Sequence, residues 1–166
     1  MSWTQSRIAE ITSKSDRIAV SQQNAIAARQ IVAANEGHLW EMLAEDLLAK
    51  TKEFAVEFSQ AEFTQLTAER RANTVTIATK IYPRLRFQIV YHAGVGVDGE
   101  ISEIYSALAE ERARKLNMIR LTVDPQMEPC YTDGDRYLHP VMVSEELMEQ
   151  VARFYENAAR KPRPLI

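Results

Sequence analysis

The sequence has few residues of the kinds that carry catalysis or bind metal ions. Its single cysteine, Cys130, cannot form a disulfide within the chain. The three histidines, His38, His92 and His139, have neither H-x-H nor H-x-x-x-H spacing, so no metal site is predicted. We therefore expect no metal, no cofactor and no recognisable catalytic group, which argues against an enzyme.

Long hydrophobic runs and a large net charge are also absent. The N-terminus has no apolar stretch resembling a signal peptide or a membrane span, so we expect a cytoplasmic protein without a membrane partner. The formal net charge of -3 makes nucleic acid an unfavoured partner, since the overall charge does not attract it. The 166 residues, of which 46% are hydrophobic, suffice for one domain with a core.

The middle of the chain predicts antiparallel strands, because apolar side chains alternate with period two. A turn at residues 82–84 keeps these side chains on one face of the sheet. This register pairs Ile81 with Leu85 and Val75 with Tyr91. A shift by one residue would bring polar side chains to the buried face.

Three glycines after the second strand match the dinucleotide-binding pattern G-x-G-x-x-G: Gly94, Gly96 and Gly99. They suggest a small-molecule or nucleotide site. Polar and basic residues alternate along the preceding strand, whereas the first strand of a dinucleotide-binding fold is nearly all apolar. The chain downstream also has too few strand and helix alternations for that fold.

A hairpin explains the same glycines better. Asp98-Gly99 is a typical two-residue turn between apolar alternating segments. The turn would place Val97 opposite Glu100 and Ile89 opposite Leu108. Whether residues 101–115 form a strand or a helix stays open at this point.

A basic face is predicted on the second strand. Arg84, Arg86 and His92 share one side of it, and the register above puts Lys80 directly opposite Arg86. Like charges that face each other across a strand pair destabilise it. Either a carboxylate such as that of Glu103 neutralises them, or the face receives an anionic partner such as a nucleic-acid backbone.

Residues 1–36 are expected to form a helical arm, rich in Ala, Gln, Ile and Arg. An apolar stripe recurs along it every seven residues: Ile11, Ile18, Ala25 and Val32. The companion positions of a coiled-coil seam are polar, so only half of the seam is present. Two interpretations stay open: the helix packs along its own domain, or it is a self-association or partner helix, since a stripe this narrow buries little area within one chain.

Asn35-Glu36-Gly37 predicts a break or kink, since glycine is unfavourable inside a helix. A second helix should follow and cover the sheet with one apolar stripe: Trp40, Leu43, Leu47, Phe54 and Phe58. Residues 61–73 are expected to connect this helix to the sheet.

The C-terminal half continues the sheet. Residues 110–115 are expected to form a turn, residues 119–123 a fourth strand and residues 127–131 a fifth. Ser144 is predicted to cap a C-terminal helix that packs on the same sheet face as the second helix.

The sequence thus predicts an α+β fold, with a helical arm at 1–36 and a single domain at 37–166 that holds an antiparallel meander of about five strands. The expected function is a non-enzymatic interaction or assembly module, which associates with itself or with a protein partner through the N-terminal helix and the open sheet face. A ligand-binding protein or enzyme using residues 94–99 is the alternative, and nucleic-acid binding on the basic face is a second one.

Overall fold

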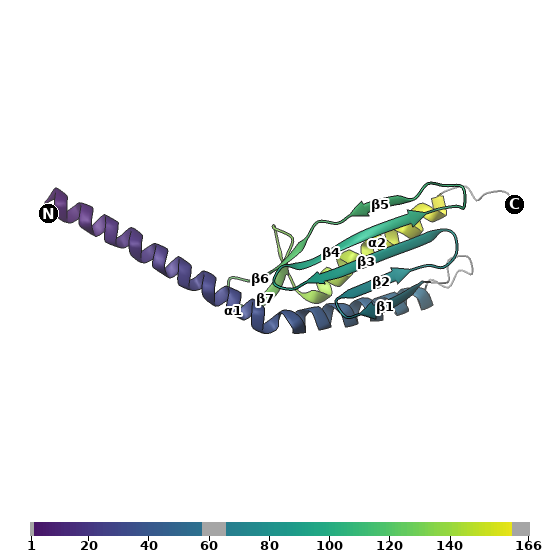
Figure 1. Ribbon diagram of the computed structural model, residues 1–166, viewed down its shortest axis with the longest axis horizontal. Coiled ribbons are helices and arrows are strands. Elements are labelled where there is room, and N and C mark those ends of the chain that lie inside the picture. The colour runs from purple at the N-terminus through teal and green to yellow at the C-terminus, as the bar shows by residue number, and fades with distance from the viewer. Residues whose placement is uncertain (1, 58–65, 161–166) are drawn as a thin grey trace.

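The computed structural model describes residues 2–57 and 66–160. These residues form two long helices and one antiparallel sheet (Figure 1). In chain order the elements are α1 (Trp3–Glu57), β1 (Thr67–Arg71), β2 (Thr74–Ala78), β3 (Arg84–His92), β4 (Gly96–Ile104), β5 (Arg112–Lys115), β6 (Ile119–Val123), β7 (Pro129–Thr132), β8 (Tyr137–Leu138) and α2 (Pro140–Arg160).

The strands follow the order β1-β2-β3-β4-β6-β7-β8, and β5 also pairs with β4. The predicted α+β class and antiparallel sheet are confirmed, with eight strands in place of about five. One unpredicted strand is β1, in the second half of the expected connector. Its sequence Thr-Ala-Glu-Arg-Arg has no apolar alternation, and pairing with β2 holds it in place. Residues 61–65 of the connector lie outside the described residues.

The second half of α1 and the whole of α2 cover the same face of the sheet, as predicted. On α1, Trp40, Leu43 and Leu47 are buried, and the Phe54 ring lies 5.4 Å from that of Tyr155 on α2. The sheet contributes the buried side chains of Val75, Ile77, Leu85, Phe87, Ile89, Val97 and Ile101. Phe58 lies outside the described residues. The opposite face of β2 and β3 carries no helix (Figure 1).

Of the two expectations for Asn35-Glu36-Gly37, a break or a kink, the break is wrong, because α1 stays helical through these residues. The Asn35 side-chain amide donates a hydrogen bond of 2.8 Å to the carbonyl of Ile31, one turn earlier. Glu36 uses its carboxylate to accept a hydrogen bond from the backbone N–H of Gly94. These contacts hold the helix where glycine would otherwise weaken it. Figure 1 shows α1 changing direction between its projecting half and the half on the sheet.

The register of β2 and β3 differs from the prediction by two residues. Val75 pairs with Ile89 in place of Tyr91 and still faces the core, whereas Ile81, expected opposite Leu85, lies in the loop after β2 and is 44% exposed. The reason is a longer loop closed by Thr79. Its hydroxyl accepts a hydrogen bond from the N–H of Leu85 and donates one to the carbonyl of Pro83.

β3 and β4 form the predicted hairpin, but its turn is not at Asp98-Gly99. The chain turns at residues 93–95, and Gly99 pairs with Ile89 inside the sheet. Gly94 has φ of +73°, which glycine adopts without strain. Because β4 ends at Ile104, Leu108 is exposed and does not meet Ile89. The helical alternative for 101–115 is therefore wrong, and the predicted turn at 110–115 contains β5.

The predicted fourth strand is confirmed as β6, and the fifth is displaced slightly to β7. The C-terminal helix begins at Pro140, four residues before the predicted cap. Proline is favoured in the first turn, since its missing N–H needs no partner there. The carbonyl of His139 accepts hydrogen bonds from the N–H groups of Met142 and Val143. Ser144 is consequently inside the helix and buried.

Candidate functional site

The first half of α1 projects away from the sheet (Figure 1). Every described residue up to Ile26 is exposed, and partial burial begins at Ala27. Four isoleucines on the projecting part lie in solvent: Ile8 and Ile18 are each 59% exposed, Ile11 is 57% exposed and Ile26 is 54% exposed. Side chains of this kind are normally buried. The projecting part, residues 3–26, is called the arm below.

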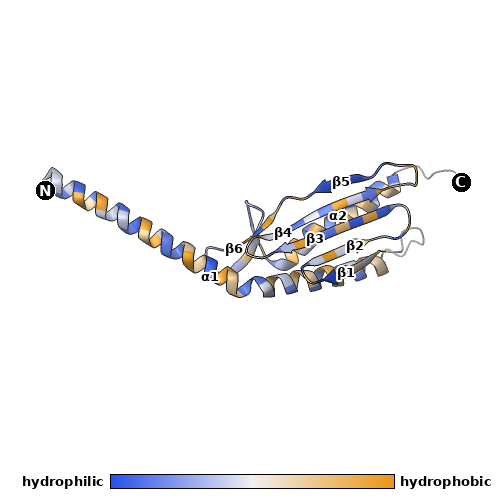
Figure 2. Ribbon diagram, viewed as in Figure 1, coloured by the Kyte–Doolittle hydropathy of each residue, from blue (hydrophilic) through white to orange (hydrophobic). Residues whose placement is uncertain are grey.

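The apolar stripe of the arm continues the surface by which α1 packs on its own sheet. Ile11, Ile18, Ala25 and Val32 are followed at the same spacing by Leu39, which is only 5% exposed and belongs to the core. Figure 2 shows hydrophobic bands recurring along the helix beyond the domain. The arm therefore presents a core-like surface without a sheet to cover it.

A groove of about 410 Å³ lies where the arm joins the domain. One wall is α1 and the other is β6 with the turn before β4. The lining residues are Ala28, Arg29, Val32, Ala33, Glu36, Gly94, Leu121, Thr122 and Val123. The apolar stripe runs directly into this groove at Val32. Sequence reasoning missed the groove, because β6 lies more than eighty residues away along the chain.

A polar and aromatic cluster fixes α1 to the sheet beside the groove. The Glu36 carboxylate accepts a hydrogen bond of 2.7 Å from the Gly94 N–H. Burial, and then the hydrogen bond with Glu36, raise the pKa of Tyr91 to about 12. The Tyr91 ring stacks on that of Trp40 at a centroid distance of 5.5 Å. Burial also raises the pKa of Tyr131, whose hydroxyl has no hydrogen-bond partner among the described residues.

The three glycines of the dinucleotide pattern each have a place in the sheet. Gly94 forms the hairpin turn. Gly96 passes so close to β6 that an added Cβ would lie 2.0 Å from the carbonyl oxygen of Ile119. At Gly99 a Cβ would lie 2.8 Å from the Phe87 ring. No helix follows them, so the helix N-terminus on which a pyrophosphate binds is missing here.

The predicted basic face is present on the uncovered side of β3, but its expected repulsive pair is absent. Lys80 lies in the loop after β2, and Arg86 faces Ala78 and Ser102. Lys80 is therefore not opposite Arg86, because the loop closed by Thr79 is longer than expected.

The four basic residues have different surroundings. The Arg84 guanidinium lies 4.5 Å from the Tyr82 ring centroid, a cation–π distance. His92 Nε2 lies 2.9 Å from Asp98 Oδ1. No carboxylate pairs with Arg84, Arg86 or Lys80 within residues 2–57 and 66–160. The suggested partner Glu103 is wrong for this role: it is buried on the other face, where it accepts a hydrogen bond from Tyr105.

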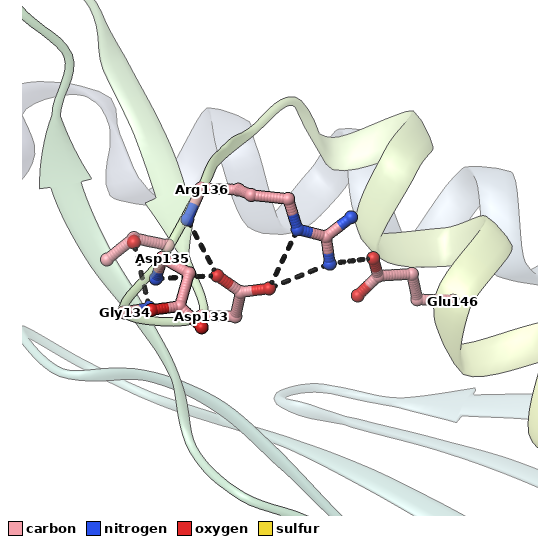
Figure 3. Close-up of polar contacts among 6 residues, drawn as sticks. Asp133, Gly134, Asp135, Arg136 and Glu146 are labelled. Atoms are coloured by element: carbon pink, nitrogen blue, oxygen red, sulfur yellow. Dashed lines mark hydrogen bonds and ion pairs between the residues drawn. The ribbon is translucent and has the colours of Figure 1, made fainter.

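An acidic turn between β7 and β8 is occupied by the chain's own groups (Figure 3). Asp133 Oδ1 accepts hydrogen bonds from the N–H groups of Asp135 and Arg136, and Oδ2 accepts two from the Arg136 guanidinium. Arg136 also reaches Glu146 on α2. These bonds, chiefly those from the Arg136 side chain, lower the pKa of Asp133 to about 2. The cluster ties the last hairpin to α2.

Within the described part of the chain, no group of three or more His, Cys, Asp or Glu residues is placed to hold a metal ion. Neither described helix is long and apolar enough to cross a membrane. Comparison of the chain with protein-family models, curated proteins and solved structures found no match.

Proposed function

We propose that this protein is a non-enzymatic assembly module that associates with itself through the arm. The observation that carries the proposal is the apolar stripe of α1, which is buried against the sheet from Leu39 onward and exposed before Ile26. A second copy of the same stripe supplies a surface of matching shape and polarity. Association would remove the isoleucines from water.

The free energy gained when the arms pair depends on the exposed fraction of each isoleucine side chain. Full burial of an isoleucine contributes about 1.5 to 3 kcal/mol. Because Ile8, Ile11 and Ile18 are between 57% and 59% exposed, pairing can bury only that fraction of each. Six such side chains in a dimer contribute roughly 5 to 11 kcal/mol. This contribution comes from few residues, so substitution of two of them should weaken association strongly.

The other functions that the sequence suggested have less support. The glycines at 94, 96 and 99 all have structural roles, which leaves a ligand site without a dedicated residue. The basic face has the His92 ring beside Asp98 and the Arg84 guanidinium stacked on Tyr82. The arm is the feature that the fold itself leaves unexplained.

Sedimentation of the full chain tests the proposal. We expect a multiple of 18.9 kDa at micromolar concentration. The double substitution Ile11→Ser and Ile18→Ser should yield a monomer, and since Ile and Ser have similar helix propensities, circular dichroism should change little.

The matched control is Val20→Ser. Val20 is 55% exposed but lies about 160° around the helix from Ile18, given 100° per residue. It should sediment like the natural chain. A natural chain that is monomeric at all concentrations up to the solubility limit refutes the proposed function.

A further inference from the structure

We infer that two copies pair through antiparallel arms, and that the tip of each arm occupies the groove at the root of the other. This inference rests on the proposed self-association and adds its geometry. It concerns the orientation of the helices and the use of a groove that a simple coiled coil would not need.

The position of the domain excludes parallel arms. The stripe that is free at Ile11 and Ile18 is covered by the chain's own sheet from Leu39 onward, so the domain lies on the stripe side of α1. In a parallel pair both stripes face each other along their whole length. Each domain would then occupy the space that the other domain needs. Antiparallel arms place the two domains at opposite ends.

The residue pattern also favours the antiparallel register in which the numbers of facing residues add up to 40. The contacts between the copies are then Ile8 with Val32, Ile11 with Arg29, Ser15 with Ala25 and Ile18 with Gln22. Each of these four layers contains at least one apolar side chain. Such alternation is what a half-polar seam requires to bury its apolar residues.

The charged residues of the arm also favour the antiparallel orientation. In a parallel pair Arg29 faces Arg29 of the second copy inside the seam, where like charges repel. In the antiparallel register Arg29 lies beside Ile11 and Glu10 of the second copy. The exposed Glu10 carboxylate already pairs with Arg7 at 2.5 Å and with Lys14 at 3.0 Å of its own chain, so Arg29 of the second copy would share it with them. What favours the antiparallel register is thus the removal of the contact between the two Arg29 side chains.

The groove receives the tip of the second arm. Its walls include Val32 on α1 and Leu121 and Val123 on β6, so it continues the stripe with an apolar surface on two sides. The register places Ile8 of the second copy at Val32, inside the groove.

Distances between spin labels measure the orientation in the intact protein. Ser6, Ser13 and Val20 are exposed and repeat every seven residues on the side of the arm away from the stripe. Each is changed to cysteine in turn, in a full chain carrying Cys130→Ala. At 1.5 Å rise per residue, antiparallel arms separate the two labels along the axis by about 42 Å at 6, about 21 Å at 13 and about 0 Å at 20.

The three outcomes are distinct. A distance that decreases from 6 to 20 supports the inference. Similar distances at all three positions indicate parallel arms, which overturns the inference while self-association stands. Labelled chains that stay monomeric overturn both the inference and the proposed function.

A pair of neighbouring substitutions tests the groove separately. Ala33 lines the groove and Ala34 does not, and both are exposed. Alanine and arginine are both good helix formers, so the fold should tolerate either change. Ala33→Arg fills the space for the second arm and should raise the dimer Kd at least about tenfold, while Ala34→Arg should leave it unchanged. An unchanged Kd for Ala33→Arg refutes occupation of the groove.

Discussion

Replacement of Gly96 by alanine should destabilise the fold far more than the same change at Gly94. Both glycines belong to the G-x-G-x-x-G pattern, so a ligand site would need both. In the structure their surroundings differ. An added Cβ at Gly94 has nothing within 4 Å, whereas at Gly96 it lies 2.0 Å from the Ile119 carbonyl oxygen and 2.8 Å from the Arg120 Cα.

The expected loss of stability depends on how far the backbone of β6 must move to accept the added Cβ. Ordinary contact begins near 3.4 Å, so the backbone of β6 must retreat by about 1.4 Å from β4. Only two residue pairs join these strands, Gly96 with Arg120 and Val97 with Ile119. Loss of buried hydrogen bonds costs about 1 to 3 kcal/mol each, and alanine at φ of +149° adds about 1 to 3 kcal/mol of strain. Gly96→Ala should therefore cost roughly 3 to 6 kcal/mol, and Gly94→Ala about 1 to 2 kcal/mol.

Denaturant unfolding monitored by circular dichroism measures both effects. Gly37→Ala is the control, because Gly37 lies inside α1 with open space around it. That change should stabilise the protein by about 0.5 to 1 kcal/mol. Equal free energies of unfolding for Gly96→Ala and Gly94→Ala would refute the close approach of β4 to β6. They would reopen a ligand-binding role for the glycines.

Two pH dependences follow from the shifted groups. Burial is the main cause that raises the pKa values of Tyr91, Tyr105 and Tyr155 to about 12. Their contribution to stability is therefore complete below about pH 10 and is lost as the pH rises toward 12. A free energy of unfolding that stays constant between about pH 10 and about pH 12 would contradict the burial of these hydroxyls. Hydrogen bonds from Arg136 hold the pKa of Asp133 at about 2, so the stability from this turn is present above about pH 4 and is lost as the pH falls toward 2. The carboxyl carbon of Asp133 should titrate near pH 2 by NMR and near pH 4 in Arg136→Ala, and a midpoint near 4 in the natural chain would exclude the turn geometry.

The sequence predicted those features that depend on neighbouring residues. Period-two alternation correctly identified β2, β3 and β6 and the side of each that faces the core. Helical spacing of apolar residues predicted the helix that covers the sheet. The alternation alone did not determine the strand registers, because the Thr79 hydroxyl in the loop fixes the pairing of β2 with β3.

The errors arose where distant segments meet. Asp98-Gly99 has the composition of a turn, yet Gly99 lies inside β4. Glycine is needed there because the Phe87 ring occupies the space where a Cβ would be. The helix through Gly37 is held by Glu36 and the N–H of Gly94, which only the folded chain brings together. The groove beside the arm likewise depends on β6. Local propensity carries no information about these contacts.

The continuity of α1 gives the protein a fixed internal length. At 1.5 Å per residue, its 55 residues span roughly 80 Å in one piece of secondary structure. In the proposed dimer, the length of the arm would set the distance between the two domains. Seven extra residues would lengthen the arm by about 10 Å and keep the stripe on the same side, whereas two would turn the stripe by about 200°. Spacing and orientation in an assembly of this chain are thus encoded in the number of residues before the sheet.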